Sequence, residues 1–333
     1  MEGSRDYSFD ILKGILILLV VLGHAIHYQY GENCWYFPLF DFIYTFHMPL
    51  FIMVSGCFFI SCTKRTPMEM LKNKSKRLLL PWFVWSLLVL LVSLIIKILF
   101  LKDSLSSMGI IKTIFIEFGT YWYLLCVFSL TLFYYPMFRL ENGKNRVFVS
   151  GLLFIAWFCS LCFFQKIPSE FYLFKHSQIT RQTIIFGIGI LFSLYYDRMK
   201  SWVKVILCVG CLLGVFCDRI LFGRWIIEYN LYQRIVDGFF CSLPMFFVLK
   251  KLSQLLNARN FKLRRFLIYC GQNSLGIYMV HMFFSHTLIK YPMLPQNSSL
   301  LGGFLLFFFY FIVSVLLIEI VKRATTKSYV FGI

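Results

Sequence analysis

Two ionisable side chains share one long apolar segment near the N-terminus. Residues 12–25 read LKGILILLVVLGHA, and none of the ten residues between Lys13 and His24 is polar. Eleven steps along an α-helix return His24 to within about 20° of Lys13, about 16 Å further along the axis. A neutral imidazole is suited to take a proton from a hydroxyl. Snorkelling to the headgroups would explain Lys13 alone, but the aligned pair indicates a polar interior face on which both residues are candidates for function.

A second polar stripe lies in GQNSLGIYMVH, residues 271–281. Ser274, Tyr278 and His281 are spaced i, i+4, i+7, which places them on one helix face. Lipid offers such groups no partners, so the stripe must face protein, as part of a site or as hydrogen-bonding contacts between helices. Asn273 is expected to cap this helix at its start.

Other polar side chains fall toward the extracytoplasmic ends of the expected helices. They could line a cleft for a hydroxylated ligand, although an interfacial position is an alternative for each aromatic or His. These acceptor-side candidates are His47, Glu117, Trp122, Arg181 and Asp237.

A basic stretch, KNKSKRLLLPW at residues 72–82, carries Lys76 and Arg77. Its charge is typical of a cytoplasmic anchor that follows the positive-inside rule. The same charge would also suit the mouth of a site for a phosphorylated ligand. Both interpretations place the stretch on the cytoplasmic side.

Composition places these groups in a lipid bilayer. The 333 residues are 59% hydrophobic, 20% aromatic and only 14% charged. Apolar runs of roughly 20 residues predict transmembrane helices rather than the short alternating strands of a barrel. The chain is therefore expected to be an all-α, polytopic transmembrane bundle that forms a single domain over residues 1–333. About ten spans are predicted, near 9–28, 39–61, 78–100, 115–138, 147–164, 180–196, 202–218, 233–249, 267–289 and 301–321.

The positive charge follows this topology. The net charge of +18 sits in short connections, and Lys and Arg concentrate in alternate ones beginning with the N-terminus. This bias predicts that both termini are cytoplasmic. It also explains the charge without nucleic acid as a partner. The CxxC pairs Cys159–Cys162 and Cys208–Cys211 lie in apolar runs without His or acidic ligands nearby, so no metal site is predicted.

Five stretches spread along the chain form a combined pattern. They are RDYSFDILKGILILLVVLGH (5–24), FIYTFHMPLFIMVSGCFF (42–59), KRLLLPW (76–82), YWYL (121–124) and GQNSLGIYMVH (271–281). Together they resemble the integral-membrane acyltransferase-3 family, particularly its fucose 4-O-acetylase-like branch. Any one motif alone would be weak. Many family members carry Arg where this chain has Lys13.

The resemblance implies transfer of an acyl group, usually acetyl, from cytoplasmic acyl-CoA to a hydroxyl of a cell-surface or lipid-linked glycan. Acyl-CoA is a co-substrate, and no bound cofactor is implied. The family's catalytic His corresponds to His24, and its essential basic partner to Lys13. A multi-pass protein of the bacterial inner membrane is expected.

The expected site extends this assignment to neighbouring residues. Tyr278 could stabilise the developing oxyanion, and His281 joins the catalytic group. Lys13, Lys76, Arg77 and Ser274 are expected to bind the donor. Direct transfer and an acyl-imidazole intermediate both remain open. A transporter or flippase for a glycolipid or small polar solute is the alternative function, because the same polar stripes could line a permeation route.

Overall fold

The structure is a computed structural model of the chain. It describes residues 6–101, 107–139, 148–156, 159, 180–221, 231–258, 261–291, 296, 298–325 and 329–331. Over these ranges the backbone forms helices joined by turns and contains no β-strand. The prediction of an all-α protein is therefore confirmed.

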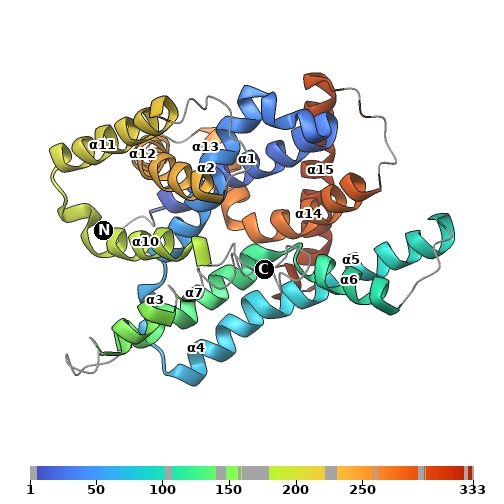
Figure 1. The fold of residues 1–333 in the computed structure, drawn as a ribbon, viewed down its shortest axis with the longest axis horizontal. Helices are drawn as coiled ribbons and strands as arrows, with labels where there is room; N and C mark the ends of the chain where they lie inside the picture. Colours follow the sequence, from blue (N-terminus) through green and yellow to red (C-terminus); the bar gives the residue numbers. More distant parts are fainter. Residues whose placement is uncertain are drawn as a thin grey trace. The chain divides into compact units, whose positions relative to one another are not determined.

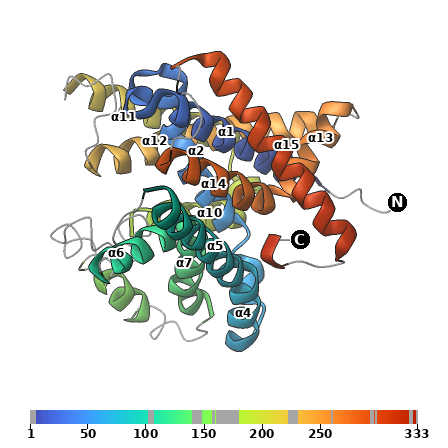
Figure 2. The same ribbon diagram turned by 90° about the vertical axis from the view of Figure 1, so that its right-hand side faces the viewer.

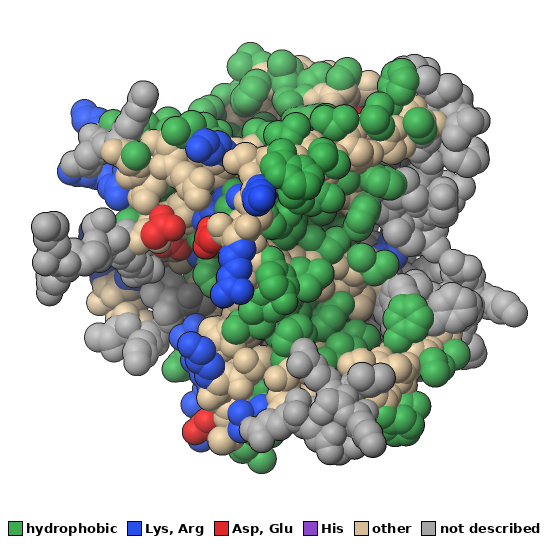
Figure 3. Space-filling view, turned by 90° about the vertical axis from the view of Figure 1, so that its left-hand side faces the viewer, with side chains coloured by type: hydrophobic (Ala, Val, Ile, Leu, Met, Phe, Trp, Pro, Cys, Tyr) green, Lys and Arg blue, Asp and Glu red, His purple; other side chains and the backbone are tan. Residues whose placement is uncertain are grey.

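Several of the helices are long and apolar enough to cross a bilayer. Within the described ranges there are five, or six if one bent pair counts as a single span. The five are Ser8–Tyr30, Pro38–Thr63, Pro67–Leu99, Gly238–Asn257 and Leu300–Ala324. Exposed hydrophobic side chains run along helix α15 (Leu300–Ala324), as expected of a helix that faces lipid. They are Leu300, Leu301, Phe304, Leu305, Phe308, Phe309, Ile312, Leu316 and Ile320. Hydrophobic side chains also cover much of the face drawn in Figure 3.

The chain folds as two compact units. The first comprises Met1–Val54, Tyr195–Lys327 and Ile333, and the second comprises Ser55–Leu194 and Ser328–Gly332. The main helices of the first unit are α1 (Ser8–Tyr30), α2 (Pro38–Cys57, which ends in the second unit), α11 (Ser201–Leu221), α12 (Leu231–Asn257), α13 (Lys262–Gln272), α14 (Ser274–Lys290) and α15. Helix α1 packs against α12, α13, α14 and α15 and forms the centre of this unit (Figures 1 and 2).

Glycine allows α1 to approach α13 closely. A Cβ added to Gly14 would collide with the carbonyl of Leu267, and one added to Gly271 would collide with the carbonyl of Asp10. The two backbones are therefore in direct contact where they cross. Close helix approach through small residues is a common way to pack helices in membranes.

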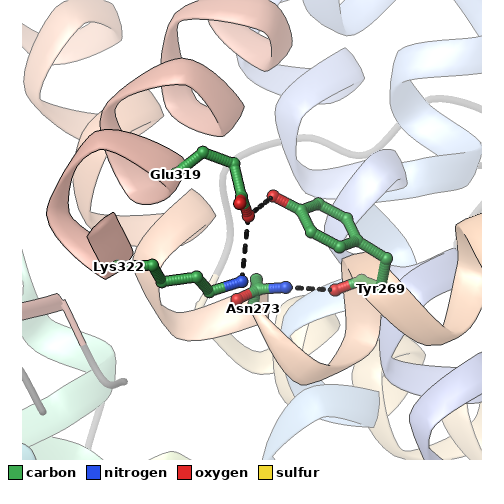
Figure 4. A network of polar contacts seen from close by, with 4 residues as sticks. All are labelled: Tyr269, Asn273, Glu319 and Lys322. Carbon is green, nitrogen blue, oxygen red and sulfur yellow. Dashed lines mark hydrogen bonds and ion pairs between the residues drawn. The ribbon is translucent and has the colours of Figure 1, made fainter. Parts of the chain in front are cut away.

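The predicted helix over 267–289 is two helices, α13 and α14. Asn273 lies between them with φ −99° and ψ 12° and makes no N-cap hydrogen bond with its side chain, so the prediction of a cap is wrong. Its Nδ2 instead donates to the carbonyl of Tyr269 over 2.8 Å. The Tyr269 hydroxyl in turn donates to Glu319 on α15 over 2.7 Å, and Lys322 pairs with Glu319 at 3.0 Å (Figure 4). This network ties the break between α13 and α14 to α15.

The second unit contains a long helical rod and a bent pair. The rod, Pro67–Leu99, runs through α4 (Pro67–Lys74), the π-helical turn η2 (Ser75–Leu79), α5 (Leu80–Ile96) and the start of η3 (Lys97–Leu101). The pair is α6 (Ser107–Phe118) and α7 (Trp122–Arg139), bent by 67°, so the predicted helix 115–138 is also broken. The shorter elements of the chain are α3 (Ile60–Thr63), α10 (Thr183–Tyr195), η1 (Gly31–Tyr36), η6 (Tyr196–Arg198) and η7 (Tyr329–Phe331).

The close crossing of α1 and α13 makes a stability prediction. Gly271→Ala should force the helices apart and lower the free energy of unfolding by about 1–3 kcal/mol, the usual cost of overpacking. Gly210→Ala on α11 is the matched control, because a Cβ there meets nothing within 4 Å. Thermal unfolding in detergent should show a lower Tm for Gly271→Ala and an unchanged or higher Tm for Gly210→Ala. Equal melting of both variants would contradict the close contact.

Candidate active site

His24 lies on α1 beside two other polar rings of the first unit. Its Nδ1 is 3.3 Å from the hydroxyl of Tyr44 on α2. Its ring centroid is 5.5 Å from that of His281 on α14. The His24 side chain is half-buried. The N-terminal motif and the C-terminal polar stripe, which lie more than two hundred residues apart in sequence, therefore meet at one place.

Tyr44 is held in position by aromatic packing. After α1 the chain turns through η1, where Gly31 adopts φ +51°. Tyr44 stacks on Phe40 with ring centroids 3.9 Å apart. A Cβ at Gly23 would come within 2.8 Å of Cε2 of Tyr44, so glycine makes room for the ring one residue before His24. Sequence reasoning missed Tyr44, although its i, i+3 spacing from His47 gave a signal.

His281 has one nitrogen fixed by the backbone. Its Nδ1 lies 2.7 Å from the carbonyl of Ile277 one turn earlier. A carbonyl can only accept, so Nδ1 carries the hydrogen and Nε2 holds the lone pair of the neutral ring. The residue is 0% exposed, and Nε2 has no hydrogen-bond partner within the described part of the chain. The ring of Tyr278 lies 5.8 Å away between centroids, and Ser274 is half-buried at the start of the same helix.

His47 belongs to the same group of rings. Its Nδ1 donates to the carbonyl of Ile43 over 2.7 Å, and its ring centroid is 4.6 Å from that of Tyr44. We call His24, Tyr44, His47, Tyr278 and His281 the histidine cluster. In the described ranges, His, Cys, Asp and Glu side chains form no group of three or more suited to a metal ion.

Lys13 lies on α1 nearer the N-terminus than the cluster. Its Nζ pairs with Asp10 at 2.9 Å, a contact that residues three positions apart on one helix can make. Helix α1 is unbroken from Lys13 to His24, so both residues keep the helical alignment expected from their spacing. The chain thus carries a cation and an imidazole at separate levels of one helix.

A buried lysine that the sequence analysis did not single out lies near the start of α1. Lys250 on α12 is 5% exposed and donates to the Ser8 hydroxyl over 2.7 Å. The Ser8 hydroxyl donates in turn to Asp6 over 2.9 Å. Burial opposes ionisation of Asp6, but the Ser8 hydrogen bonds and the charge of Lys250 outweigh it and lower the pKa of this carboxyl. This network fixes the entry of the chain into α1.

Most remaining candidates lie in the second unit. Lys76 and Arg77 are exposed on η2, and Trp122 and Arg181 are half-buried. Glu117 is 0% exposed and accepts a hydrogen bond from Ser93 over 2.9 Å. Asp237 lies on α12 in the first unit, and its side chain is outside the described residues. The assignment of these residues to donor or acceptor binding stays a prediction.

Comparison with known proteins gives the class of this site. The sequence model of the acyltransferase-3 family, described as an acyltransferase domain, matches residues 6–321. The chain belongs to that family. That family is membrane-embedded, and the matched range contains Lys13 and every residue of the histidine cluster.

Two curated relatives are similar to part of this chain. The nodulation protein NolL of Sinorhizobium fredii is 36% identical over 130 residues, which are 38% of this chain and 35% of the relative. The protein of the same name from Mesorhizobium japonicum is 37% identical over 131 residues, which are 38% of this chain and 34% of the relative. The similarity thus spans about a third of the length of each relative.

The contact between Tyr44 and His24 makes a prediction about acyl transfer. Tyr44→Phe keeps the ring packing but removes the hydroxyl, and a hydrogen bond of this kind contributes about 1 kcal/mol. We expect the rate of acyl transfer to fall roughly fivefold to tenfold while the Tm stays within about a degree of wild type. Steady-state kinetics and thermal unfolding on the same preparations measure both quantities. An unchanged rate would show that the hydroxyl does not position His24.

Proposed function

We propose that this acyltransferase moves an acetyl group from cytoplasmic acyl-CoA to a hydroxyl of a cell-surface or lipid-linked glycan, with His24 as general base. The observation that carries the proposal is the contact of His24 with two other polar rings: its Nδ1 is 3.3 Å from the Tyr44 hydroxyl, and its ring centroid is 5.5 Å from that of His281. The neighbouring hydroxyl would orient the imidazole for proton transfer.

The proposed chemistry begins with the acceptor hydroxyl, which is a poor nucleophile while it keeps its proton. His24 takes that proton at Nε2 as the oxygen attacks the acyl carbon. The Tyr44 oxygen accepts a hydrogen bond from Nδ1–H, which holds the tautomer that leaves Nε2 unprotonated. Tyr278 donates to the oxyanion that develops on the acyl oxygen. The proton that His24 takes from the hydroxyl is balanced by the proton that the thiolate takes up to become free CoA.

The donor is proposed to approach from the cytoplasmic side. Lys13 and Ser274 would contact the pantetheine or phosphate portion, and Lys76 and Arg77 would attract its phosphates at the entrance. Lys13 retains Asp10 as a partner at 2.9 Å, so donor binding would compete with or extend an existing ion pair. Arg would bind a phosphate through a bidentate fork, whereas Lys13 offers a point charge.

The acceptor is proposed to bind from the opposite side. His47 supports this assignment, because its ring lies 4.6 Å from Tyr44 and so adjoins the proposed base. Glu117, Trp122, Arg181 and Asp237 would contact sugar hydroxyls or stack on sugar faces. These four assignments rest on sequence position and residue type.

The proposed membrane arrangement follows the charge distribution. Ten spans would place both termini in the cytoplasm of a bacterium, with the whole of residues 1–333 acting as one transmembrane acyltransferase domain in the inner membrane. Membership of the fucose 4-O-acetylase-like branch belongs to this proposal, as does the absence of a bound cofactor. The lipid bilayer, acyl-CoA and the glycan are the proposed partners, and nucleic acid is not one.

Reconstituted protein with labelled acetyl-CoA and candidate glycans tests the function. Loss of a general base costs about 10²–10⁴-fold in rate, so His24→Ala should reduce transfer to that extent. The matched control is His27→Ala, which removes an imidazole one turn further along α1. We expect the control to keep wild-type transfer.

Two results would contradict the proposal. Full transfer by His24→Ala would remove His24 from the chemistry. Movement of a lipid or solute across the membrane without consumption of acetyl-CoA would favour the transporter instead.

A further inference from the structure

The two imidazoles beside each other in the histidine cluster differ in their surroundings. His24 is half-buried, and its Nδ1 contacts a hydroxyl that can donate or accept. His281 is 0% exposed, and its Nδ1 contacts a carbonyl that can only accept. The protonation pattern of neutral His281 is therefore fixed by the backbone, with the lone pair on Nε2.

The lone pair of His281 has a feature that favours nucleophilic attack. Nε2 has no hydrogen-bond partner in the described part of the chain, so no such bond must break before the nitrogen forms a new one. A buried polar atom without a partner costs free energy and calls for an explanation. The explanation proposed for Nε2 is that it bonds to the substrate during the reaction.

Burial also suits the product of such an attack. An acyl group on an imidazole is readily hydrolysed, and a site that excludes water protects reactive intermediates. His281 is 0% exposed, whereas His24 is half-buried. The enclosed ring is therefore the better carrier of an acyl group, and the accessible ring is the better base for an incoming hydroxyl.

We propose, building on the acyltransferase function above, that Nε2 of His281 carries the acyl group as a covalent intermediate between donor and acceptor. The lone pair of Nε2 attacks the thioester carbon, the C–N bond forms, the C–S bond breaks and CoA leaves as the thiolate. The positive charge of the acylimidazolium balances the thiolate, and the hydrogen on Nδ1 stays bonded to the Ile277 carbonyl.

The second half of the reaction returns the site to its starting state. The acceptor hydroxyl attacks the acyl carbon while His24, 5.5 Å away between ring centroids, takes its proton. The C–N bond breaks, its electron pair returns to Nε2, and His281 is again neutral. The CoA thiolate takes up a proton from water after it leaves, and His24 returns the proton of the hydroxyl to water, so the proton count balances. Donor and acceptor therefore need not occupy the site together.

The test is isotope exchange without an acceptor. Purified protein in lipid nanodiscs is mixed with unlabelled acetyl-CoA and labelled CoA, and the label that enters acetyl-CoA is measured. Reversible formation of an acyl-enzyme makes wild type catalyse this exchange. His281→Gln should lose it by at least about a hundredfold, together with transfer to the acceptor. His24→Gln should keep the exchange within a few fold but lose transfer to the acceptor.

His286→Gln is the matched control, since it removes another imidazole of α14 and should leave exchange and transfer intact. If His281→Gln does not fold, peptide mapping of wild type after rapid quenching decides, and an acetyl group on His281 is expected. Three results would each overturn the proposal. They are exchange that persists in folded His281→Gln, an acetyl group on another residue, and transfer by wild type without exchange. The last result would leave the acyltransferase function standing, whereas absence of transfer with every glycan would count against that function.

Discussion

The crossing of α1 and α13 at Gly14 and Gly271 is the contact on which the site depends. Because neither glycine has a Cβ, the two backbones touch, and α13 is held against the N-terminal half of α1. The chain then breaks at Asn273 and continues as α14, which packs along the same central helix. His281 thereby reaches His24. Residues more than two hundred positions apart meet because α13 and then α14 pack against the same helix, α1.

The apolar setting determines what these polar groups can do. In a bilayer a polar side chain must find its partner within the protein. His47 and His281 both use the carbonyl four residues earlier, which leaves the other ring nitrogen as the basic one. His24 instead depends on a hydroxyl from a second helix. The backbone thus fixes the protonation pattern of His47 and His281 in the same way, whereas the hydroxyl of Tyr44 sets His24 apart from them.

Much of the site was predictable from the sequence, but its connections were not. The alignment of Lys13 with His24 follows from helix geometry, and the structure keeps α1 unbroken between them. The stripe ending at His281 was also evident. Its meeting with His24 was not, because the pairing of helices distant in sequence depends on packing that periodicity does not encode.

The errors have physical causes as well. Asn273 does hold the N-cap position of α14, but the helix before it offers the Tyr269 carbonyl as a partner, and its side chain bonds backward to that group instead of capping α14.

A double-mutant cycle on kcat/KM for acetyl transfer, with His24→Gln and His281→Gln singly and together, tests most directly whether the two rings form one catalytic unit. The account predicts strong non-additivity, with the double variant no slower than the slower single variant. Losses that multiply independently would contradict it.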